Sequence, residues 1–140
     1  MKTIKRVRIV IFHDSKLLLL KKELKKNYTF PGGIVKKDET LKEGLIREVY
    51  EEIGAEVSKK DLRYLASFSL KKRSRIEENH YYLLLNPEQF QFKLLEPIKF
   101  SEMSWINVIK ASKQLKFYEK FVVDDILLSS YHKAYNDLII

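Results

Sequence analysis

The spacing of hydrophobic residues predicts strands on both sides of one long helix. Apolar and polar residues alternate over 6–12, and a second apolar run covers 16–21, so this region is predicted to form a strand, a tight turn and a strand. Alternation returns at 61–70 and 80–85, which predicts two more strands. This order of elements predicts an α/β (α+β) fold in which a mixed β-sheet is flanked by helices.

The helix between these strands is predicted to be amphipathic. Its apolar residues recur at intervals of one, three and four, and they are Leu41, Leu45, Ile46, Val49 and Ile53. Either Asp38 or Thr40 can cap its start, and Gly54 is a natural stop. Gly44 lies inside it, where glycine costs about 1 kcal/mol relative to alanine. We therefore expect the backbone at Gly44 to lie close against a sheet.

The remaining pattern is less regular. Residues 71–79 are predicted to form a polar loop, whose basic side chains are either solvated or in contact with substrate phosphates, and 89–94 form a strand or an irregular segment. Residues 102–106 predict a late strand, and a closing helix is predicted from Asp124 onward by a stripe that contains Leu127, Tyr131, Ala134 and Leu138. The histidines His13, His80 and His132 are interpreted as structural or surface residues rather than catalysts.

Composition narrows the classes of protein to which the chain can belong. A chain of 140 residues predicts a single domain over 1–140. Because cysteine is absent, disulfides, thiolate metal sites and cysteine nucleophiles are excluded, and a reducing, cytoplasmic location is expected. No signal peptide and no run of roughly 20 apolar residues is found, so no membrane partner is expected.

The charge balance favours contact with polyanions. Lysine and arginine number 27 against 19 acidic residues, which gives a formal net charge of +8. Such a surface attracts nucleotides or RNA, although a lysine-rich coat that keeps the protein in solution has the same composition.

The acidic residues that matter most stand on one face of the predicted helix. Glu48, Glu51 and Glu52 occupy positions i, i+3 and i+4, which brings three carboxylates together. Like charges at this spacing destabilise a helix by roughly 0.2–0.5 kcal/mol per pair. We therefore expect the three side chains to converge without basic partners until a cation binds them. Side chains that point apart or toward lysines would count against an enzyme.

The ligand types indicate which cation this would be. Carboxylates without histidine or cysteine suit Mg²⁺, or Mn²⁺, and Mg²⁺ commonly completes its shell with substrate phosphates. The turn formed by Gly32 and Gly33 can bring backbone close to the metal or to a phosphate. The segment is thus predicted to form a metal site for a phosphorylated substrate.

These residues resemble the signature of the Nudix hydrolase family, G-x5-E-x7-R-E-U-x-E-E-x-G-U, in which U is a bulky aliphatic residue. The seven fixed positions of that signature are matched by Gly33, Glu39, Arg47, Glu48, Glu51, Glu52 and Gly54. Seven such matches arise by chance at about one in 10⁸ starting points. Ala55, at the last position, is smaller than usual.

The resemblance implies a fold and a reaction. It implies the Nudix α/β/α sandwich and Mg²⁺-dependent hydrolysis of the pyrophosphate bond of a nucleoside diphosphate linked to a group X. Glu48, Glu51 and Glu52 would hold the metal, with the Gly32 carbonyl as a further ligand, while Glu39 and Arg47 would tie the loop to the helix and orient these glutamates. It also implies a core position for Trp105.

Several alternatives stay open after the resemblance. The general base is Glu48, Glu52 or a loop acid, for which Glu102 is favoured over Glu96. Tyr28 and Phe30 either stack on a nucleobase or belong to the core. A nucleotide substrate such as a nucleoside triphosphate is favoured over the 5′ end of RNA, and the family includes homodimers. The alternative function is a non-catalytic module that binds nucleotide or RNA through its basic surface.

Overall fold

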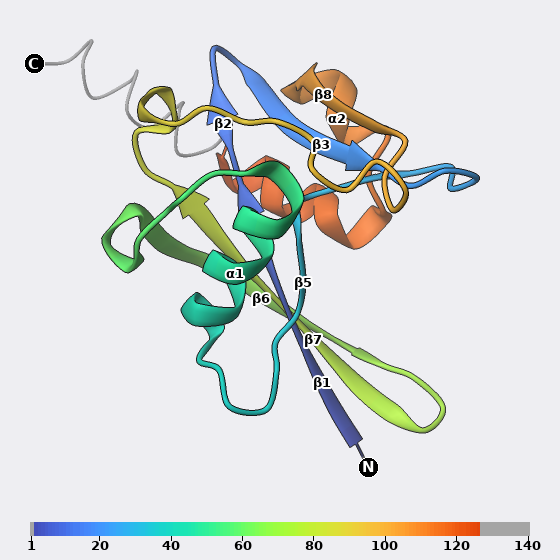
Figure 1. Cartoon of the computed structure of the whole chain (residues 1–140). Coiled ribbons are helices and arrows are strands. Elements are labelled where there is room, and N and C mark those ends of the chain that lie inside the picture. The colour runs from blue at the N-terminus through green and yellow to red at the C-terminus, as the bar shows by residue number, and fades with distance from the viewer. Residues whose placement is uncertain (1, 127–140) are drawn as a thin grey trace, which may run out of the picture.

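The computed structural model describes residues 2–126 and arranges their strands in two sheets. In the first sheet, β1 (Lys2–Val10) lies between β5 (Gly32–Ile34) and β7 (Arg75–Leu84), and β6 (Leu62–Lys71) pairs with the outer edge of β7. The contact between β1 and β7 is parallel and the other two are antiparallel, so this sheet is mixed, as expected. Figure 1 shows α1 (Leu41–Ile53) lying across it.

A second sheet, not expected from the sequence, continues from the end of β1. It contains β2 (Phe12–His13), β3 (Lys16–Lys21), β4 (Tyr28–Thr29) and β8 (Glu102–Asn107), with β3 between the others. The turn between β2 and β3 places Asp14 and Ser15 at positive φ, which confirms the predicted strand, tight turn and strand.

The short helices complete the described chain. They are η1 (Lys59–Asp61), η2 (Pro87–Gln89), α2 (Val108–Ser112) and η3 (Phe117–Glu119), and residues 120–126 are also helical. Residues 90–101 contain no strand, so the irregular alternative for 89–94 is the one observed. The predicted stripe from Leu127 to Leu138 and His132 lie outside the described residues.

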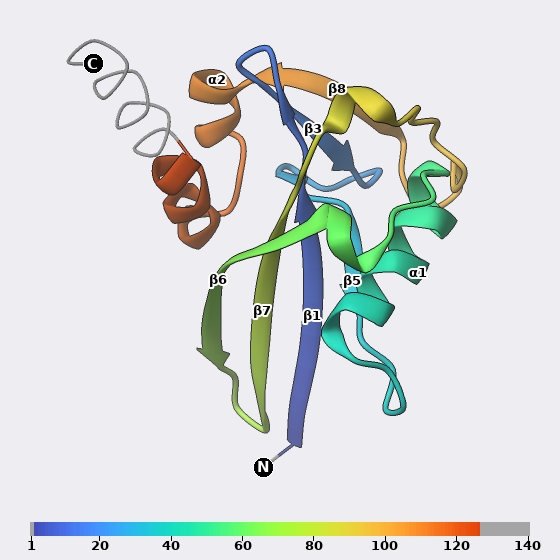
Figure 2. The same cartoon turned by 90° about the vertical axis from the view of Figure 1, so that its left-hand side faces the viewer.

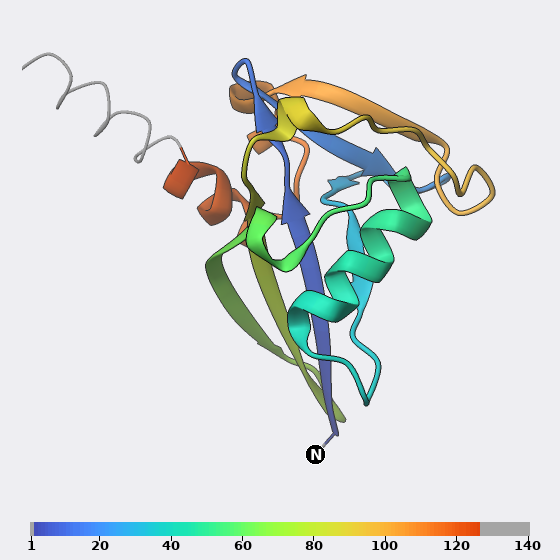
Figure 3. The same ribbon diagram turned by 60° about the vertical axis from the view of Figure 1, so that its left-hand side comes forward.

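The first sheet has a core on each of its faces, which is the α/β/α arrangement. On one face, Val7 and Ile9 of β1 pack with Leu45, Val49 and Ile53 of α1. Val10, Tyr81 and Phe30 belong to the other core, which contains Val122, Val123 and Ile126. Figure 2 shows α1 on one side of β1 and β7, with the segment up to residue 126 on the other, and Figure 3 shows α1 beside β5.

Three details correct the sequence analysis. Strand β7 begins at Arg75, so residues 75–79 are strand rather than loop, because pairing with both β1 and β6 extends it through polar residues. Trp105 is 41% exposed and contacts Phe92, because β8 is an edge strand and Ile106 is the residue that faces the core. At Gly44 an added Cβ would meet Val35 and Glu39, so the helix approaches the preceding loop rather than a sheet.

No helix among residues 2–126 is long and apolar enough to cross a membrane.

Candidate active site

The start of α1 is fixed by a capping box. Thr40 rather than Asp38 is the N-cap: its hydroxyl accepts from the Glu43 backbone N–H at 3.2 Å, and the Glu43 carboxylate accepts from the Thr40 N–H at 2.9 Å. Gly54 ends the helix in a left-handed conformation, at φ 71°. The bounds of the helix therefore follow from the local sequence.

An ion pair connects the loop before the helix to its middle. The Arg47 guanidinium donates to both oxygens of Glu39, at 2.7 and 2.9 Å, and to the Ile34 carbonyl at 3.1 Å. Glu39 also accepts from the Lys36 N–H at 2.8 Å. The hydrogen bonds from Arg47 lower the pKa of Glu39 to about 2. We call the ion pair of Glu39 and Arg47 the brace. The family resemblance implied this contact.

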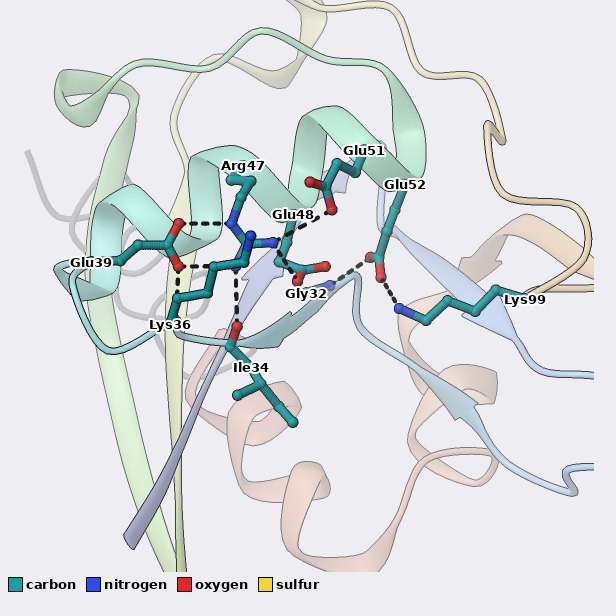
Figure 4. A network of polar contacts seen from close by, with 9 residues as sticks. All are labelled: Gly32, Ile34, Lys36, Glu39, Arg47, Glu48, Glu51, Glu52 and Lys99. Carbon is teal, nitrogen blue, oxygen red and sulfur yellow. Dashed lines mark hydrogen bonds and ion pairs between the residues drawn. The ribbon is translucent and has the colours of Figure 1, made fainter.

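Arg47 also reaches the predicted metal ligands. Its Nη1 lies 2.9 Å from Glu48 Oε1 and 3.4 Å from Glu51 Oε2. Glu48 is buried, whereas the Glu51 side chain is half exposed. Figure 4 shows the three glutamates leaving one side of α1, with Glu51 close to Arg47.

Glu52 lies in a different environment although it is only one turn from Glu48. It has no exposed surface, accepts from the Gly32 N–H at 2.9 Å, and is 3.2 Å from Lys99 Nζ. Burial raises the pKa of Glu52 to about 7, even though Gly32 and Lys99 both act to lower it. Its negative charge is therefore only partly compensated by the protein.

The two glycines make room for these carboxylates. A Cβ on Gly33 would lie 2.6 Å from the carboxyl carbon of Glu48, and one on Gly32 would lie 2.0 Å from the Val7 carbonyl oxygen. Gly32 also has φ 146°, which other residues rarely adopt. Glycine thus lets β5 lie against the Glu48 carboxylate at Gly33 and against the backbone of β1 at Gly32.

The expectation that the three glutamates converge without basic partners is wrong. Arg47 pairs with Glu48 and Glu51, Lys99 pairs with Glu52, and within residues 2–126 no three acidic, histidine or cysteine side chains lie close enough together to hold a metal. The pairing with Lys99 was not foreseen because Lys99 is 47 residues away in the chain. The residues still fit Mg²⁺ chemically, because Glu48 and Glu52 supply buried carboxylate oxygens and the absence of a Cβ at Gly33 leaves the Glu48 carboxylate room against the backbone.

A cavity of about 500 Å³ opens beside Gly32, Gly33 and Glu48. Its basic lining residues come from four parts of the chain, and they are Arg6, Arg8, Lys22, Lys25, Lys26, Lys99 and Lys116. Glu48 is the one acidic residue among its described lining residues. This arrangement suits a ligand with several negative charges.

Phe30 and Tyr28, the two aromatic residues that the sequence offered for stacking on a nucleobase, lie in different environments. Phe30 has no exposed surface and belongs to the core, and its carbonyl accepts from Arg8 Nη1 at 2.8 Å. Tyr28 lines the cavity, and its hydroxyl donates to Glu102.

Glu102 is not among the residues that line the cavity. It accepts hydrogen bonds from Ser104 and Tyr28, which lower its pKa. Its observed contacts are those of a residue that holds Tyr28 in place.

Sequence reasoning missed Arg6, Arg8 and Lys99 as lining residues. The first two have a signal in the sequence, since they alternate with buried Val7 and Ile9 and must share the opposite face of β1. Lys99 lies in an irregular segment, where no periodicity indicates the direction of a side chain.

Known proteins resemble this chain in sequence and in fold. A family model described as the NUDIX domain matches residues 2–124. A Bacillus subtilis (strain 168) protein with the name "Putative 8-oxo-dGTP diphosphatase YtkD" is 35% identical over 103 residues, which are 71% of this chain and 63% of that protein. The chain thus spans somewhat under two thirds of the length of this relative.

Solved structures share the fold at lower identity. The E. coli ORF135 protein superposes with a TM-score of 0.74 at 24% identity, covering 91% of each chain. A MutT NUDIX hydrolase from Burkholderia pseudomallei gives 0.76 at 17% identity, covering 90% of this chain and 99% of that one. These structures share the fold, and the match of the family model over residues 2–124 shows that the chain belongs to the Nudix family.

Proposed function

We propose that this protein hydrolyses the pyrophosphate bond of a nucleoside diphosphate linked to a group X, with Mg²⁺ as its cofactor. The observation that carries the proposal is the position of Glu48: this buried carboxylate lines a cavity whose other charged lining residues are cations. The buried carboxylate of Glu52 lies directly behind the lining, where it accepts from the Gly32 N–H. A cavity of this kind attracts a polyphosphate and leaves one acidic region against which a metal can bind.

The side chains of the cavity have separate roles in this proposal. Arg8 and Lys22 bind phosphate oxygens, and the brace holds Glu48 in place through Arg47. When Mg²⁺ is held by Glu48, Glu51, Glu52 and the Gly32 carbonyl, it supplies charge neutralisation at phosphorus and lowers the pKa of a bound water.

Glu48 is the favoured general base. It lines the cavity, whereas Glu52 has no exposed surface and Glu102 lies outside the lining. A base must come within hydrogen-bond reach of the proton that it accepts, so access ranks Glu48 above the other two.

Nucleoside triphosphates are the proposed substrates. The name of the Bacillus subtilis relative includes 8-oxo-dGTP, which makes oxidised deoxynucleotides the first group to test. The cavity volume of about 500 Å³ lies in the range of pockets that enclose one small ligand.

Release of phosphate, pyrophosphate and nucleoside monophosphate from a nucleotide panel tests the proposal. The panel contains ordinary and oxidised dNTPs, ADP-ribose and dinucleoside polyphosphates, each with Mg²⁺ and with chelator. We expect Glu51→Gln and Glu52→Gln to reduce kcat by at least about 100-fold. The matched control is Glu56→Gln, because Glu56 is exposed and lies beyond the helix. Equal turnover by all three variants would contradict the assignment of the site.

A non-catalytic module that binds nucleotide or RNA is the second candidate. The ion pairs of Glu48, Glu51 and Glu52 favour it, because they reduce the charge available to a metal. It predicts no turnover with any metal, together with RNA binding that weakens steeply with salt and is the same in all three variants.

A further inference from the structure

Three hydrogen-bonded polar side chains lie on β6 and β7, away from the candidate active site. Tyr64 Oη lies 3.0 Å from His80 Nδ1, and His80 Nε2 lies 3.0 Å from Glu78 Oε1. We call these three side chains the relay. None of them lines the cavity beside Gly32 or a second cavity, of about 460 Å³, that shares several of its lining residues. The proposed function therefore makes no use of the relay.

A β-bulge brings the relay together. Tyr64 is paired with Tyr82, and the register of β6 shifts immediately after it, because Leu65 has no register partner on β7. Such a bulge bends the strand and changes the direction of the side chains beside it. The Tyr64 ring packs edge-on against the Tyr82 ring at 5.2 Å and reaches His80 diagonally, two positions along β7. The fold thus places a phenol beside an imidazole that is not its direct cross-strand partner.

Glu78 determines which nitrogen of His80 carries the proton. A carboxylate only accepts hydrogen bonds, so the Nε2–H of His80 donates to Glu78. In the neutral imidazole Nδ1 is then an unprotonated acceptor, and the Tyr64 hydroxyl donates to it. A hydroxyl that donates to an imidazole which a carboxylate orients is the arrangement that activates a nucleophile. The relay therefore contains a hydroxyl, a base and an orienting acid in that order.

Access and charge at the relay indicate which electrophile it can take. Tyr64 is 47% exposed, whereas the His80 side chain is only 14% exposed, so a reagent from solution meets the phenol first. Within residues 2–126 no lysine or arginine pairs with Glu78 or His80. The relay therefore carries a negative charge beside the Tyr82 ring, which disfavours phosphorylated donors and favours a neutral one.

We propose that Tyr64 is a modification site, which accepts an acyl group from a neutral thioester or activated ester. His80, which was interpreted from the sequence as a structural or surface residue, is the base, and Glu78 is the positioning residue that orients it. Tyr64 Oη attacks the carbonyl carbon while its proton passes to His80 Nδ1. The bond from the carbonyl carbon to the sulfur or oxygen of the donor breaks, and the leaving thiolate or alkoxide takes the proton from His80. The products are an aryl ester on Tyr64 and a free thiol or alcohol.

Acetylation by p-nitrophenyl acetate at pH 8, where an ordinary imidazole is neutral, tests the site. Mass spectrometry of peptides measures the rate at Tyr64 relative to the rate at Tyr50 in the same protein. Tyr50 is the internal reference because it is 52% exposed, and the two histidines within residues 2–126, His13 and His80, have other partners. We expect Tyr64 to react at least about 10-fold faster than Tyr50, since a positioned base typically contributes about 10²–10⁴-fold.

His80→Phe removes the base and keeps an aromatic ring beside Tyr64, so we expect the ratio of the two rates to fall to about 1. Glu78→Gln removes the negative charge that stabilises the protonated imidazole during attack, and it should lower the ratio at least about 3-fold. Glu78 is partly exposed, so this variant keeps the test valid if His80→Phe fails to fold. His13→Gln is the matched control, because His13 is an exposed histidine on β2, and it should keep the wild-type ratio.

Equal rates at Tyr64 and Tyr50 in the wild-type protein would overturn the proposal. A ratio that neither His80→Phe nor Glu78→Gln changes would attribute the labelling to exposure alone and would overturn it as well. Acetyl phosphate, an anionic donor, tests the class of electrophile by the same ratio. A smaller ratio than with the neutral ester supports the proposal, whereas an equal or larger ratio would contradict the assignment of a neutral donor.

Discussion

Two glutamates that belong to the same signature segment experience opposite environments. Arg47 and the Lys36 N–H lower the pKa of Glu39 to about 2, so its charge is stabilised by the fold. Burial raises the pKa of Glu52 to about 7, so its charge is costly in the protein alone. The fold therefore stabilises the charge of Glu39 by itself, whereas under our proposal a bound Mg²⁺ compensates the charge of Glu52.

The largest change in the free energy of unfolding is expected when Arg47, which pairs with several glutamates of the acidic face, is replaced. Arg47→Met leaves Glu39, Glu48 and Glu51 without the guanidinium that binds all three. We expect the free energy of unfolding to fall by about 3 kcal/mol at pH 7, the size found when one member of a buried network is removed. Urea denaturation measures it, and a loss below about 1 kcal/mol would show that the brace is a surface ion pair.

Replacement of Glu52 is expected to change the free energy of unfolding by less, and to raise it instead of lowering it. Because its folded pKa lies above the ordinary carboxyl value, the penalty for its charge is absent below about pH 4.5 and complete above about pH 7. Glu52→Gln should therefore raise the free energy of unfolding by about 2 kcal/mol at pH 8 in chelator, with little gain at pH 4. Thermal unfolding at the two pH values checks this, and a destabilised variant at pH 8 would mean that Lys99 compensates the carboxylate fully.

The smallest effect is expected for Glu39→Gln. The folded pKa of Glu39 is depressed, so its contribution is present above about pH 4.5 and is lost as the pH falls toward 2. Since the side chain is partly solvated, we expect a loss of about 1 kcal/mol at pH 7 that disappears near pH 2. The same denaturation series at both pH values measures it, and a difference independent of pH would attribute the loss to packing instead of charge.

The elements that the sequence predicted best depend on near neighbours. The capping box and Gly54 set the ends of α1, β3 has the bounds expected from its apolar run, and the brace joins residues eight positions apart. A spacing of a few residues determines which atoms meet in each case. Periodicity and capping rules were sufficient for α1 and β3, whereas the brace was expected from the family resemblance.

The parts that escaped prediction depend on distant segments. The pairing of Lys99 with Glu52 and the two cavities require the irregular chain after Pro87 and strand β7 to be placed against β1 and α1. Trp105 was assigned to the core by resemblance, but the edge position of β8 leaves it partly exposed. A one-dimensional pattern shows which residues face inward, and it does not show which partner covers them.

The parallel pairing of β1 with β7 also has a consequence for the order of folding. The first strand finds its central neighbour about seventy residues later, as the Arg6 and Glu77 contact illustrates. Closing so long a loop is slow, and on a ribosome the signature segment is synthesised before the strand that completes its sheet. The nascent chain is therefore expected to gain protection from protease at α1 only after residue 84 has emerged, in one late and cooperative step.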